Sequence, residues 1–569
     1  MDARDGRIQR VAKVTPAVLA QRADVADGMP RSLKNSVLRA EISPALSRMC
    51  AVSTGLLNEP IDRLTPSPRP HSIRKPAILA AAGAAVAAVL FWIVSGSLTD
   101  DAYISLSAAR NLAVHGEWAI VHGLTANTST SPLNVLALGA LTFLTRLWGP
   151  GDPLLALGML NAAVTGLMGW VLARICQRLG IGHGWAWLAG ALVVFNPFVL
   201  SAVGLEVLLI PAAVVVMVWL ALEGKDAWFG AAAGTAVLVR LDLLVFVVVI
   251  AALSPAIRTQ VRRTAAGFAA VAGPWYVFSW VVLGSALPDT FLIKQGQASD
   301  VGGFNYLTGP IMYFESNPWR TVASFGPAAL AVLLLVLALA AYARGRQRPV
   351  PVPGPVLALG VSGVLYYVAY VVLDTVPYHW YYVAPATTLA IFAALVVGLY
   401  WTAARGTSDR GAAGAPAVLL LMLGAGAVYY DVEGGLPWDA PPIFGNWASA
   451  HDYERVGRAV GALVGDAPVR SPGEIGTLAY FCECVMVDEF SDRGLVVEDR
   501  LVPRLAEANE PARTLLRGNY AFFDYRLAPV NPAFDLRYGE GHGPRGPMSW
   551  DVFSAARGVG HFTLVPLAG

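Results

Sequence analysis

The sequence predicts a polytopic α-helical membrane protein that ends in a soluble α/β domain. Only 14% of the 569 residues are charged and 56% are hydrophobic, whereas a soluble globular chain has about 25% charged residues. The mean hydropathy of +0.54 points the same way. Many apolar runs approach or exceed the roughly 18 residues that indicate a membrane span. A single soluble domain, a coiled coil and a disordered chain are therefore excluded.

Charge divides the chain into three parts. Residues 1–75 contain 13 Lys and Arg against 7 Asp and Glu, residues 76–434 contain 16 against 15, and residues 435–569 contain 12 against 17. The middle part therefore holds 31 charges in 359 residues. Because an ionisable group inside or beside a bilayer is costly to keep, a functional site is expected among these few charges.

The first part, residues 1–75, is polar, basic and Pro-rich near its end, and it lacks the apolar core of a signal peptide. We expect a disordered cytoplasmic tail, or a start site assigned too early. Arg74 and Lys75 then precede the apolar run 76–97. We expect the protein to lie in the plasma membrane. The positive-inside rule then predicts a cytoplasmic N-terminus and places residue 100 outside.

The second part, residues 76–434, is expected to form the membrane domain. After 76–97, apolar stretches lie at roughly 131–148, 155–176, 184–203, 205–222, 227–254, 264–284, 322–342, 353–373, 381–402 and 415–432. Basic loops that should be cytoplasmic contain Arg174 and Arg178, Arg258 with Arg262 and Arg263, Arg344 with Arg346 and Arg348, and Arg405 with Arg410. This requires either that 131–148 is not a net crossing or that one neighbouring segment is assigned wrongly, and that 227–254 crosses twice around Arg240-Leu-Asp242. We expect about eleven crossings, give or take two.

This threading puts the remaining polar segments on the exoplasmic side. They are loop 98–130, the turn at Glu206, the break at Arg240 and Asp242, loops 285–320 and 374–380, and the whole of 435–569. The last of these is long enough for its own core. Its alternating stretches APVRSP, TLAYF and VMVDEF suggest strands, and 450–464 suggests a helix, so we expect an exoplasmic α/β domain.

The exoplasmic domain contains Cys482 and Cys484, where a disulfide is permitted. On a strand, the Cα atoms of a C-x-C pair lie near the upper limit for a bridge. A strained disulfide is one alternative, and two free buried thiols are the favoured one.

The first exoplasmic loop begins with paired acids, Asp100 and Asp101, directly after a span. They are candidate catalytic residues, because two carboxylates at this place need water or a partner. The alternative is that they cap the following helix as acidic residues of its first turn, which explains one of them better than two.

Further candidates for a binding site lie at the outer ends of other spans. Glu206 stands between two long apolar runs with no partner nearby in the sequence, and Arg240 with Asp242 forms either a structural ion pair or part of the site. Asp289 and Lys294 follow a span, although a lysine there also suits snorkelling.

An aromatic segment, residues 374–382, completes the set of candidates. It contains His379, which suits an anion, and Tyr381, which suits either a sugar or an interfacial aromatic belt. Transfer of a sugar from a polyprenyl phosphate to a hydroxyl needs a general base, positive charge for the leaving phosphate and an apolar groove for the isoprenoid tail. The candidates supply these groups at one face of a membrane.

Four motifs in order resemble the GT-C glycosyltransferases, and within them the branch of mycobacterial terminal arabinofuranosyltransferases. They are DDAYISLSAARNLAVHGEW with TSPLNVLALGAL, GLE at 204–206, RLD at 240–242, and LPDTFLIK at 287–294. The likeness covers roughly 90–400. Leu241 stands where the family has Pro, Leu243 where it has Gly, and Asp289 where it has Asn, so donor recognition is expected to differ.

The resemblance implies an inverting transfer of a sugar, with arabinofuranose the example in that branch, from a polyprenyl-phosphate donor. Asp101 or Asp100 would be the base, and Glu206, Arg240, Asp242, Asp289, Lys294, His379 and Tyr381 would bind the donor. The acceptor would be a hydroxyl of a cell-envelope glycan or lipid, bound by the C-terminal domain. No nucleotide sugar and no nucleic acid are expected.

Two points stay open. The sequence has no metal signature, yet Asp100 and Asp101 would suit a divalent cation (Mg²⁺, Mn²⁺ or Ca²⁺) that bridges to the phosphate. A transporter or flippase is the main alternative function. It is disfavoured because the ionisable residues cluster at the outer ends of spans and no internal repeat is evident. A membrane-anchored scaffold would leave DDAYIS and LPDTFLIK unexplained.

Overall fold

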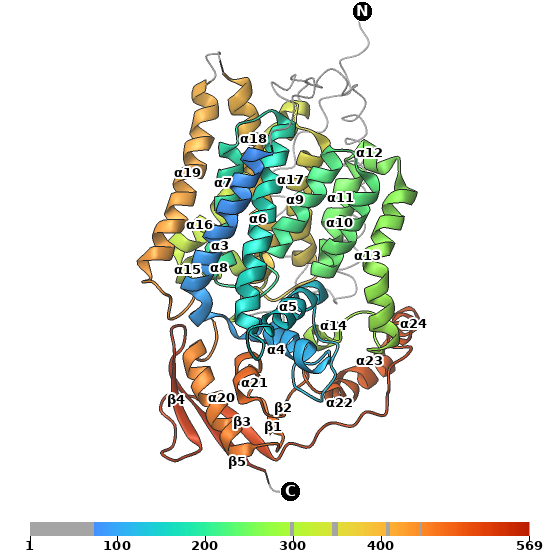
Figure 1. Ribbon diagram of the computed structural model, residues 1–569, viewed down its shortest axis with the longest axis vertical. Coiled ribbons are helices and arrows are strands. Elements are labelled where there is room, and N and C mark those ends of the chain that lie inside the picture. Colours follow the sequence, from blue (N-terminus) through green and yellow to red (C-terminus); the bar gives the residue numbers. More distant parts are fainter. Residues whose placement is uncertain (1–72, 296–300, 344–350, 406–409, 444, 568–569) are drawn as a thin grey trace, which may run out of the picture. The chain divides into compact units, whose positions relative to one another are not determined.

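A computed structural model describes residues 73–295, 301–343, 351–405, 410–443 and 445–567 (Figure 1). The predicted disordered tail, apart from its last three residues, and the basic group at 344–348 lie outside the described residues. Within them the protein is mainly helical from Arg74 to Glu433 and ends in a domain with a β-sheet. The predicted class, a polytopic α-helical membrane protein with a C-terminal α/β domain, is confirmed.

Six helical segments in the described residues are long and apolar enough to cross a membrane. They contain α3 (Arg74–Val94), α6 (Pro153–Leu179), α16 (Pro318–Ala343), α17 (Gly354–Val372), α18 (Val383–Ala403) and α19 (Arg410–Glu433). Shorter apolar helices pack among them: α5 (Pro132–Thr145), α7 (Gly184–Val194), α9 (Leu209–Leu222), α10 (Asp226–Val239) and α11 (Leu244–Ala252). Helix α13 (Val261–Val281) has two arginines in its first turn and packs on α10.

The apolar stretch 227–254 is divided at its polar break, as the sequence analysis requires. Helix α10 ends at Val239, Arg240 takes an extended conformation, and a short 3₁₀ turn, η3 (Leu241–Leu243), leads into α11. The residues that flank the pair meet again, because a Cβ at Gly224 would lie 3.6 Å from the Cβ of Ala256. The chain therefore reverses at Arg240. Helix α5 lies beside α4 (Asp100–His115), near the C-terminal domain (Figure 1).

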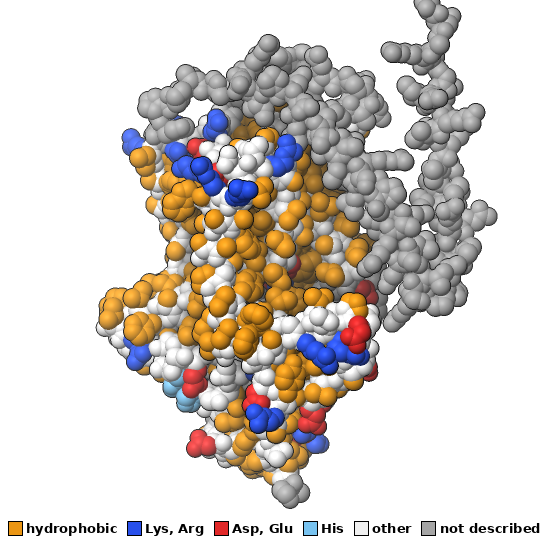
Figure 2. Space-filling view, turned by 90° about the vertical axis from the view of Figure 1, so that its right-hand side faces the viewer, with side chains coloured by type: hydrophobic (Ala, Val, Ile, Leu, Met, Phe, Trp, Pro, Cys, Tyr) orange, Lys and Arg blue, Asp and Glu red, His pale blue; other side chains and the backbone are white. Residues whose placement is uncertain are grey.

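The surface of the bundle has the pattern expected of a lipid-facing protein. Figure 2 shows a broad apolar band, with Lys and Arg side chains gathered at the end away from the C-terminal sheet. Helix α12 (Pro255–Arg258), which ends in Arg258, lies at this end of the bundle (Figure 1). That this basic end is cytoplasmic stays a prediction from the positive-inside rule.

The C-terminal domain is built on a five-stranded sheet in the order β2-β1-β3-β5-β4. The strands are β1 (Val469–Arg470), β2 (Met486–Val487), β3 (Phe534–Glu540), β4 (Ser549–Ser554) and β5 (Gly558–Pro566). Strand β1 runs parallel to β2 and β3, while β5 is antiparallel to β3 and β4. The predicted helix 450–464 is confirmed as α20 (Ala450–Val464), whose apolar face places Tyr453 and Val460 in the core with Phe562 of β5.

Two local predictions about this domain are wrong, and they share a cause. The stretch TLAYF is not a strand but part of the short helix α21 (Gly476–Cys482), which is buried between α20 and α4. Cys482 and Cys484 form a disulfide instead of remaining free thiols. Because Glu483 ends the helix in a left-handed conformation, the two Cα atoms lie 5.1 Å apart, closer than on an extended strand.

Helices α10 and α13 pack closely because glycines line their contact. A Cβ on Gly267 of α13 would collide with the backbone oxygen of Ala227, whereas a Cβ on Gly273 of the same helix would meet nothing within 4 Å. Small residues allow such close approach between apolar helices.

We therefore expect Gly267→Leu to destabilise the protein by roughly 1–3 kcal/mol, because the side chain forces the helices apart. The matched variant Gly273→Leu should change stability little. The measurement is the thermal unfolding midpoint of each purified protein in detergent. Equal midpoints for the two variants would contradict the close packing of α10 and α13.

Candidate active site

Charged side chains from four separate segments meet at the end of the helical bundle that contacts α4. Arg240 comes from the break between α10 and α11, Glu206 from the loop before α9, Asp101 from α4, and Lys294 from α14 (Thr290–Gln295). Tyr381, in the 3₁₀ turn η4 (His379–Tyr382), lies between the two cations. We call these five residues, together with Asp242 and Tyr370, the charged cluster.

Arg240 is the hub of the charged cluster. Its guanidinium donates to Asp242 through Nη2 at 2.7 Å and through Nε at 3.0 Å, and to Oε1 of Glu206 at 2.5 Å. Nη2 also donates to the hydroxyl of Tyr370 at 2.9 Å, and that hydroxyl donates to Asp242. The planar guanidinium suits such multiple bonding. One buried cation is thus compensated by two carboxylates that lie far apart in the sequence.

The loop that carries Glu206 is held against α4 by a glycine. Gly204 has a φ of +104°, and a Cβ there would collide with the Cβ of Ala102. Asn134 of α5 donates to the carbonyl oxygen of Gly204 at 3.2 Å. Since Ala102 follows Asp101 directly, this contact brings Glu206 close to the paired acids.

Lys294 forms the second positive centre of the charged cluster. Its Nζ donates to the hydroxyl of Tyr381 at 2.6 Å and lies 5.3 Å from the centre of that ring. The guanidinium carbon of Arg240 lies 5.4 Å from the same ring centre. Burial lowers the pKa of Lys294, but Tyr381 and the charge of Asp101 outweigh it, so the pKa lies above its ordinary value and the amine is charged.

Asp101 faces this positive centre and has a partly exposed side chain. Within the described parts of the chain, its carboxylate has no hydrogen-bond donor. Burial raises the pKa of Asp101, Lys294 lowers it, and Glu206 raises it, with a net increase above the ordinary value of 3.8. A raised pKa and an unused carboxylate are the properties of a general base.

Asp100, in contrast, has both carboxylate oxygens engaged in hydrogen bonds. It is buried, and its two carboxylate oxygens accept from the backbone N–H groups of Gly476 at 3.0 Å and Thr477 at 2.7 Å. These groups begin α21, so Asp100 satisfies the first turn of a helix in the C-terminal domain. Burial, together with the charge of Asp101, raises the pKa of Asp100 to about 6 despite these bonds. Asp100 caps a helix, though not its own.

Two other predicted site residues are engaged elsewhere. Asp289 is buried and forms an ion pair with Arg493 of α22 (Arg493–Leu495), with Nε and Oδ2 2.8 Å apart. Arg493 also donates to the backbone oxygen of Leu283, so the pair ties loop 283–289 to the C-terminal region. His379 is buried among aromatic rings such as Phe198 and Tyr313 rather than in the charged cluster.

The structure adds residues that sequence reasoning missed. Tyr370 joins the charged cluster from the middle of an apolar helix, where nothing in the sequence distinguishes it from a core tyrosine. Glu474 accepts from the hydroxyl of Tyr453, and burial together with Asp100 raises its pKa well above the ordinary value. Asp488 follows β2, and burial raises its pKa to about 7, with Asp100 contributing.

A cleft of about 230 Å³ lies beside Asp488 in the C-terminal domain. It is lined by Arg470, Ser471, Val487, Asp488, Glu489, Leu495, Val530 and Pro532. Ser471 and Asp488 directly follow the parallel strands β1 and β2, at the strand ends where α/β domains commonly bind ligands. The cleft is smaller than the roughly 300–1,000 Å³ of drug-sized sites, so it suits a small group.

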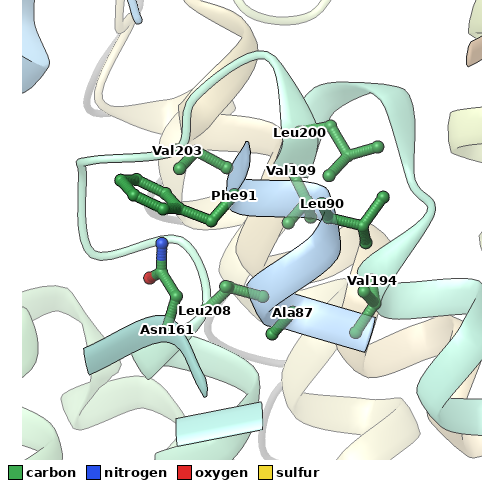
Figure 3. Close-up of a pocket in the computed structure, with 9 residues that line it drawn as sticks. All are labelled: Ala87, Leu90, Phe91, Asn161, Val194, Val199, Leu200, Val203 and Leu208. Carbon is green, nitrogen blue, oxygen red and sulfur yellow. The ribbon is translucent and has the colours of Figure 1, made fainter. Parts of the chain in front are cut away.

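A second cavity lies inside the bundle. Figure 3 shows it between α3, α6 and the segment 194–208, with Phe91 and Asn161 among its lining residues. Its volume of about 10 Å³ is close to what one water needs. It is too small to hold a ligand.

The metal alternative finds no preformed site among the described residues. No group of three or more His, Cys, Asp and Glu side chains there is arranged to hold a metal ion. Both oxygens of the Asp100 carboxylate already accept a backbone N–H, which leaves Asp101 as the carboxylate available to a cation.

The fold and the charged cluster define a polytopic membrane protein with a partly exposed acid and a partly exposed amine at the end of its bundle that contacts α4. No protein-family model matches the chain, and no curated protein matches it. Several solved structures are similar to it in part, and three of them are described below. Their similarity is below a TM-score of 0.5, so it does not decide the function.

The first structure is ArnT from Cupriavidus metallidurans bound to undecaprenyl phosphate, with a TM-score of 0.47, 14% identity, and coverage of 86% of this chain and 98% of that one. The second is the arabinofuranosyltransferase AftD from Mycobacteria, with a TM-score of 0.43, 16% identity, and coverage of 71% of this chain and 30% of that one. The third is the archaeal oligosaccharyltransferase AglB from Archaeoglobus fulgidus, in complex with an inhibitory peptide and a dolichol-phosphate. Its TM-score is 0.41 and its identity 11%, and the match covers 80% of this chain and 69% of that one. The chain spans less than a third of AftD.

We expect Asp100→Ala to destabilise the protein, because it leaves the N–H groups of Gly476 and Thr477 buried without an acceptor. The expected cost is roughly 1–3 kcal/mol for each N–H group. The matched variant Asp101→Asn removes no hydrogen bond and should keep the wild-type stability. Thermal unfolding midpoints of the two variants test this, and a midpoint for Asp100→Ala equal to that of the wild type would refute the capping role.

Proposed function

We propose that the protein is a membrane glycosyltransferase that moves a sugar from a polyprenyl phosphate to a hydroxyl group. The observation that carries this proposal is the pairing of Asp101 with Lys294. Among the described residues, the Asp101 carboxylate has no hydrogen-bond donor, and it faces the Lys294 ammonium group, which uses one of its three donors there, on Tyr381. A base and an anion-binding group at one partly exposed place suit this transfer.

The proposed reaction is a single displacement. The acceptor oxygen attacks the anomeric carbon, and Asp101 takes the proton of the acceptor hydroxyl. The bond from the anomeric carbon to the phosphate oxygen breaks, and the polyprenyl phosphate leaves with the electron pair. Lys294 stabilises the charge that develops on this phosphate. The anomeric configuration is inverted because attack and departure occur on opposite faces of the sugar.

Arg240 is proposed to position the charged cluster rather than to bind the phosphate directly. Its donors are used by Glu206, Asp242 and Tyr370, and its charge lies against Tyr381. Glu206 and Asp242 therefore act on the donor through Arg240. Asp289 acts through Arg493, by fixing the loop that leads to Lys294.

The sugar and the acceptor are the finer parts of the proposal. The motifs at 100–118, 204–206 and 287–294 favour a sugar of the arabinofuranose kind. The acceptor is a glycan or lipid of the cell envelope, and the cleft beside Asp488 is proposed to bind part of it. The negative charge of Asp100 contributes to the raised pKa of Asp488, so this cleft lies within electrostatic reach of the paired acids. We place the enzyme in the plasma membrane, with its C-terminal domain on the exoplasmic side.

The purified protein in nanodiscs should consume one member of a panel of polyprenyl-phosphate sugars and release polyprenyl phosphate. Asp101→Asn should reduce this rate about 10²–10⁴-fold, the usual contribution of a general base, with the donor still bound. Because the carboxylate form is the active one, the wild-type rate should fall as the pH drops through the raised pKa of Asp101. The exposed Glu315→Gln serves as the control.

Full activity of Asp101→Asn would remove it as the base. Movement of an intact lipid-linked sugar across a vesicle membrane, without release of polyprenyl phosphate, would instead favour a transporter or flippase. Loss of activity with a chelator, restored by Mg²⁺, Mn²⁺ or Ca²⁺, would add a divalent cation at Asp101.

We expect Lys294→Ala to weaken donor binding about 10–100-fold, because a hydrogen bond to a charged group contributes about 1.5–3 kcal/mol. The measurement is the dissociation constant for the polyprenyl phosphate itself, which requires no turnover. Lys225→Ala is the matched control, since Lys225 is an exposed lysine after α9 that lies against Trp219. An unchanged constant for Lys294→Ala would place the phosphate elsewhere.

A further inference from the structure

The C-terminal region includes a segment that covers no part of the sheet and exposes large apolar side chains. It consists of α23 (Val502–Glu507), α24 (Glu510–Asn519) and the loop to residue 527, and we call it the foot. The exposed fractions are 76% for Leu515, 55% for Phe522 and 50% for Val502. Apolar patches of this kind mark an interaction surface.

The foot joins the lower end of α13, as Figure 1 shows. The indole Nε1 of Trp280 donates to the backbone oxygen of Gly518 at 2.8 Å, and its ring packs edge-on against Phe522 at 5.1 Å. The last turns of α13 are themselves exposed and apolar, with 60% of Val277 and 50% of Val281 accessible. The apolar surface of the foot is therefore continuous with the apolar surface of this helix, on the side that faces the viewer in Figure 2.

Helix α24 has the pattern of a helix that lies in a membrane interface. Glu510, Arg513 and Arg517 recur at the helical spacing of i, i+3 and i+7 and form a polar face. Leu516 packs inward on the core of the foot. Leu515 is exposed, on a side of the helix between the polar face and the buried face. A polar face beside an apolar one, with a tryptophan at its edge, is the arrangement that interfacial helices use.

We propose that the foot lies in the head-group region of the bilayer that α13 enters, with Leu515 and Phe522 inserted among the lipids. The occupant of this surface is lipid rather than protein, because the exposed face continues directly into the apolar surface of α13. Arg517 and Arg526 are exposed beside it, within reach of lipid phosphates.

The foot also connects to the proposed active site. Its core contains Tyr520 and Phe523 together with Leu292 of α14, the helix that carries Lys294. Arg493 of α22, which precedes the foot in the sequence, lies over the ring of Phe523 and forms an ion pair with Asp289. A foot resting on the bilayer thus sets the depth of Lys294 near the level of lipid phosphates. This last step rests on the proposed function, whereas membrane contact by the foot does not.

The experiment uses the full chain in phosphatidylcholine nanodiscs, with a single NBD-labelled cysteine and a nitroxide on the lipid near the head group. Leu515→Cys is compared with Thr514→Cys on the polar side of the same helix and with Leu463→Cys on α20. The background is Cys50→Ser, in which Cys176 is buried and Cys482 is bridged to Cys484. All three replaced side chains are exposed, so the fold is preserved.

We expect NBD at position 515 to be quenched by the lipid nitroxide at least about two-fold more than at positions 514 and 463, with a blue-shifted emission. Equal quenching at 515 and 463 would overturn membrane contact by the foot. The measurement requires no turnover, so it separates this inference from the proposed transferase activity. Donor binding that stays unchanged in Leu515→Glu, while that variant loses lipid quenching from a label at 522, would overturn only the link to Lys294.

Discussion

The site depends on one buried guanidinium. Arg240 interrupts an apolar stretch, and a buried charge is tolerated only when it is paired and its hydrogen bonds are satisfied. Asp242 alone does not suffice, because a guanidinium has five N–H donors and Asp242 accepts only two of them; Glu206 and Tyr370 accept one more each. Meeting this requirement stops α10, reverses the chain into α11, and draws together the Glu206 loop and α17. Tyr381 then lies against the guanidinium, and through its hydroxyl it fixes Lys294. Removal of either carboxylate would leave N–H groups of the buried guanidinium without an acceptor, so the geometry of the charged cluster is strongly determined.

The C-terminal domain is fastened to the bundle by acids from the same motifs. Asp100 accepts two backbone N–H groups of α21, and Asp289 holds Arg493. In each motif one residue fastens the domain and a neighbour, Asp101 or Lys294, faces the open part of the site. This division of labour explains why acids occur in excess of what one base requires. It also links the position of the domain to the position of Asp101 and Lys294, since Asp100 and Asp101 are adjacent in α4 and Asp289 directly precedes α14, which carries Lys294.

The foot connects the proposed membrane contact to the proposed active site. The lipid phosphate of a polyprenyl donor lies at the depth of the head groups, while its tail lies in the hydrocarbon region. A protein that acts on such a donor must hold its cation at that depth. The foot packs on α14 through Leu292, Tyr520 and Phe523, so an interfacial position for the foot and a phosphate-level position for Lys294 follow from the same packing.

The sequence by itself determined the class of fold and most of the residues that gather in the charged cluster. Apolar length, basic loops and the break at Arg240 are local properties, and a scarce charge next to a span is visible without coordinates. What only the tertiary structure decided was the role of each acid. Asp100 and Asp101 are adjacent and chemically identical, yet one meets the first turn of α21 and the other meets Lys294, because the helix presents them in different directions. The partner of Asp289 was hidden because Arg493 is distant in the sequence, and the choice of a Cys482–Cys484 disulfide over free thiols depended on the left-handed conformation of Glu483, which leaves no local signal. Pattern identifies the residues with chemistry, whereas long-range packing selects which of them remain free to perform it.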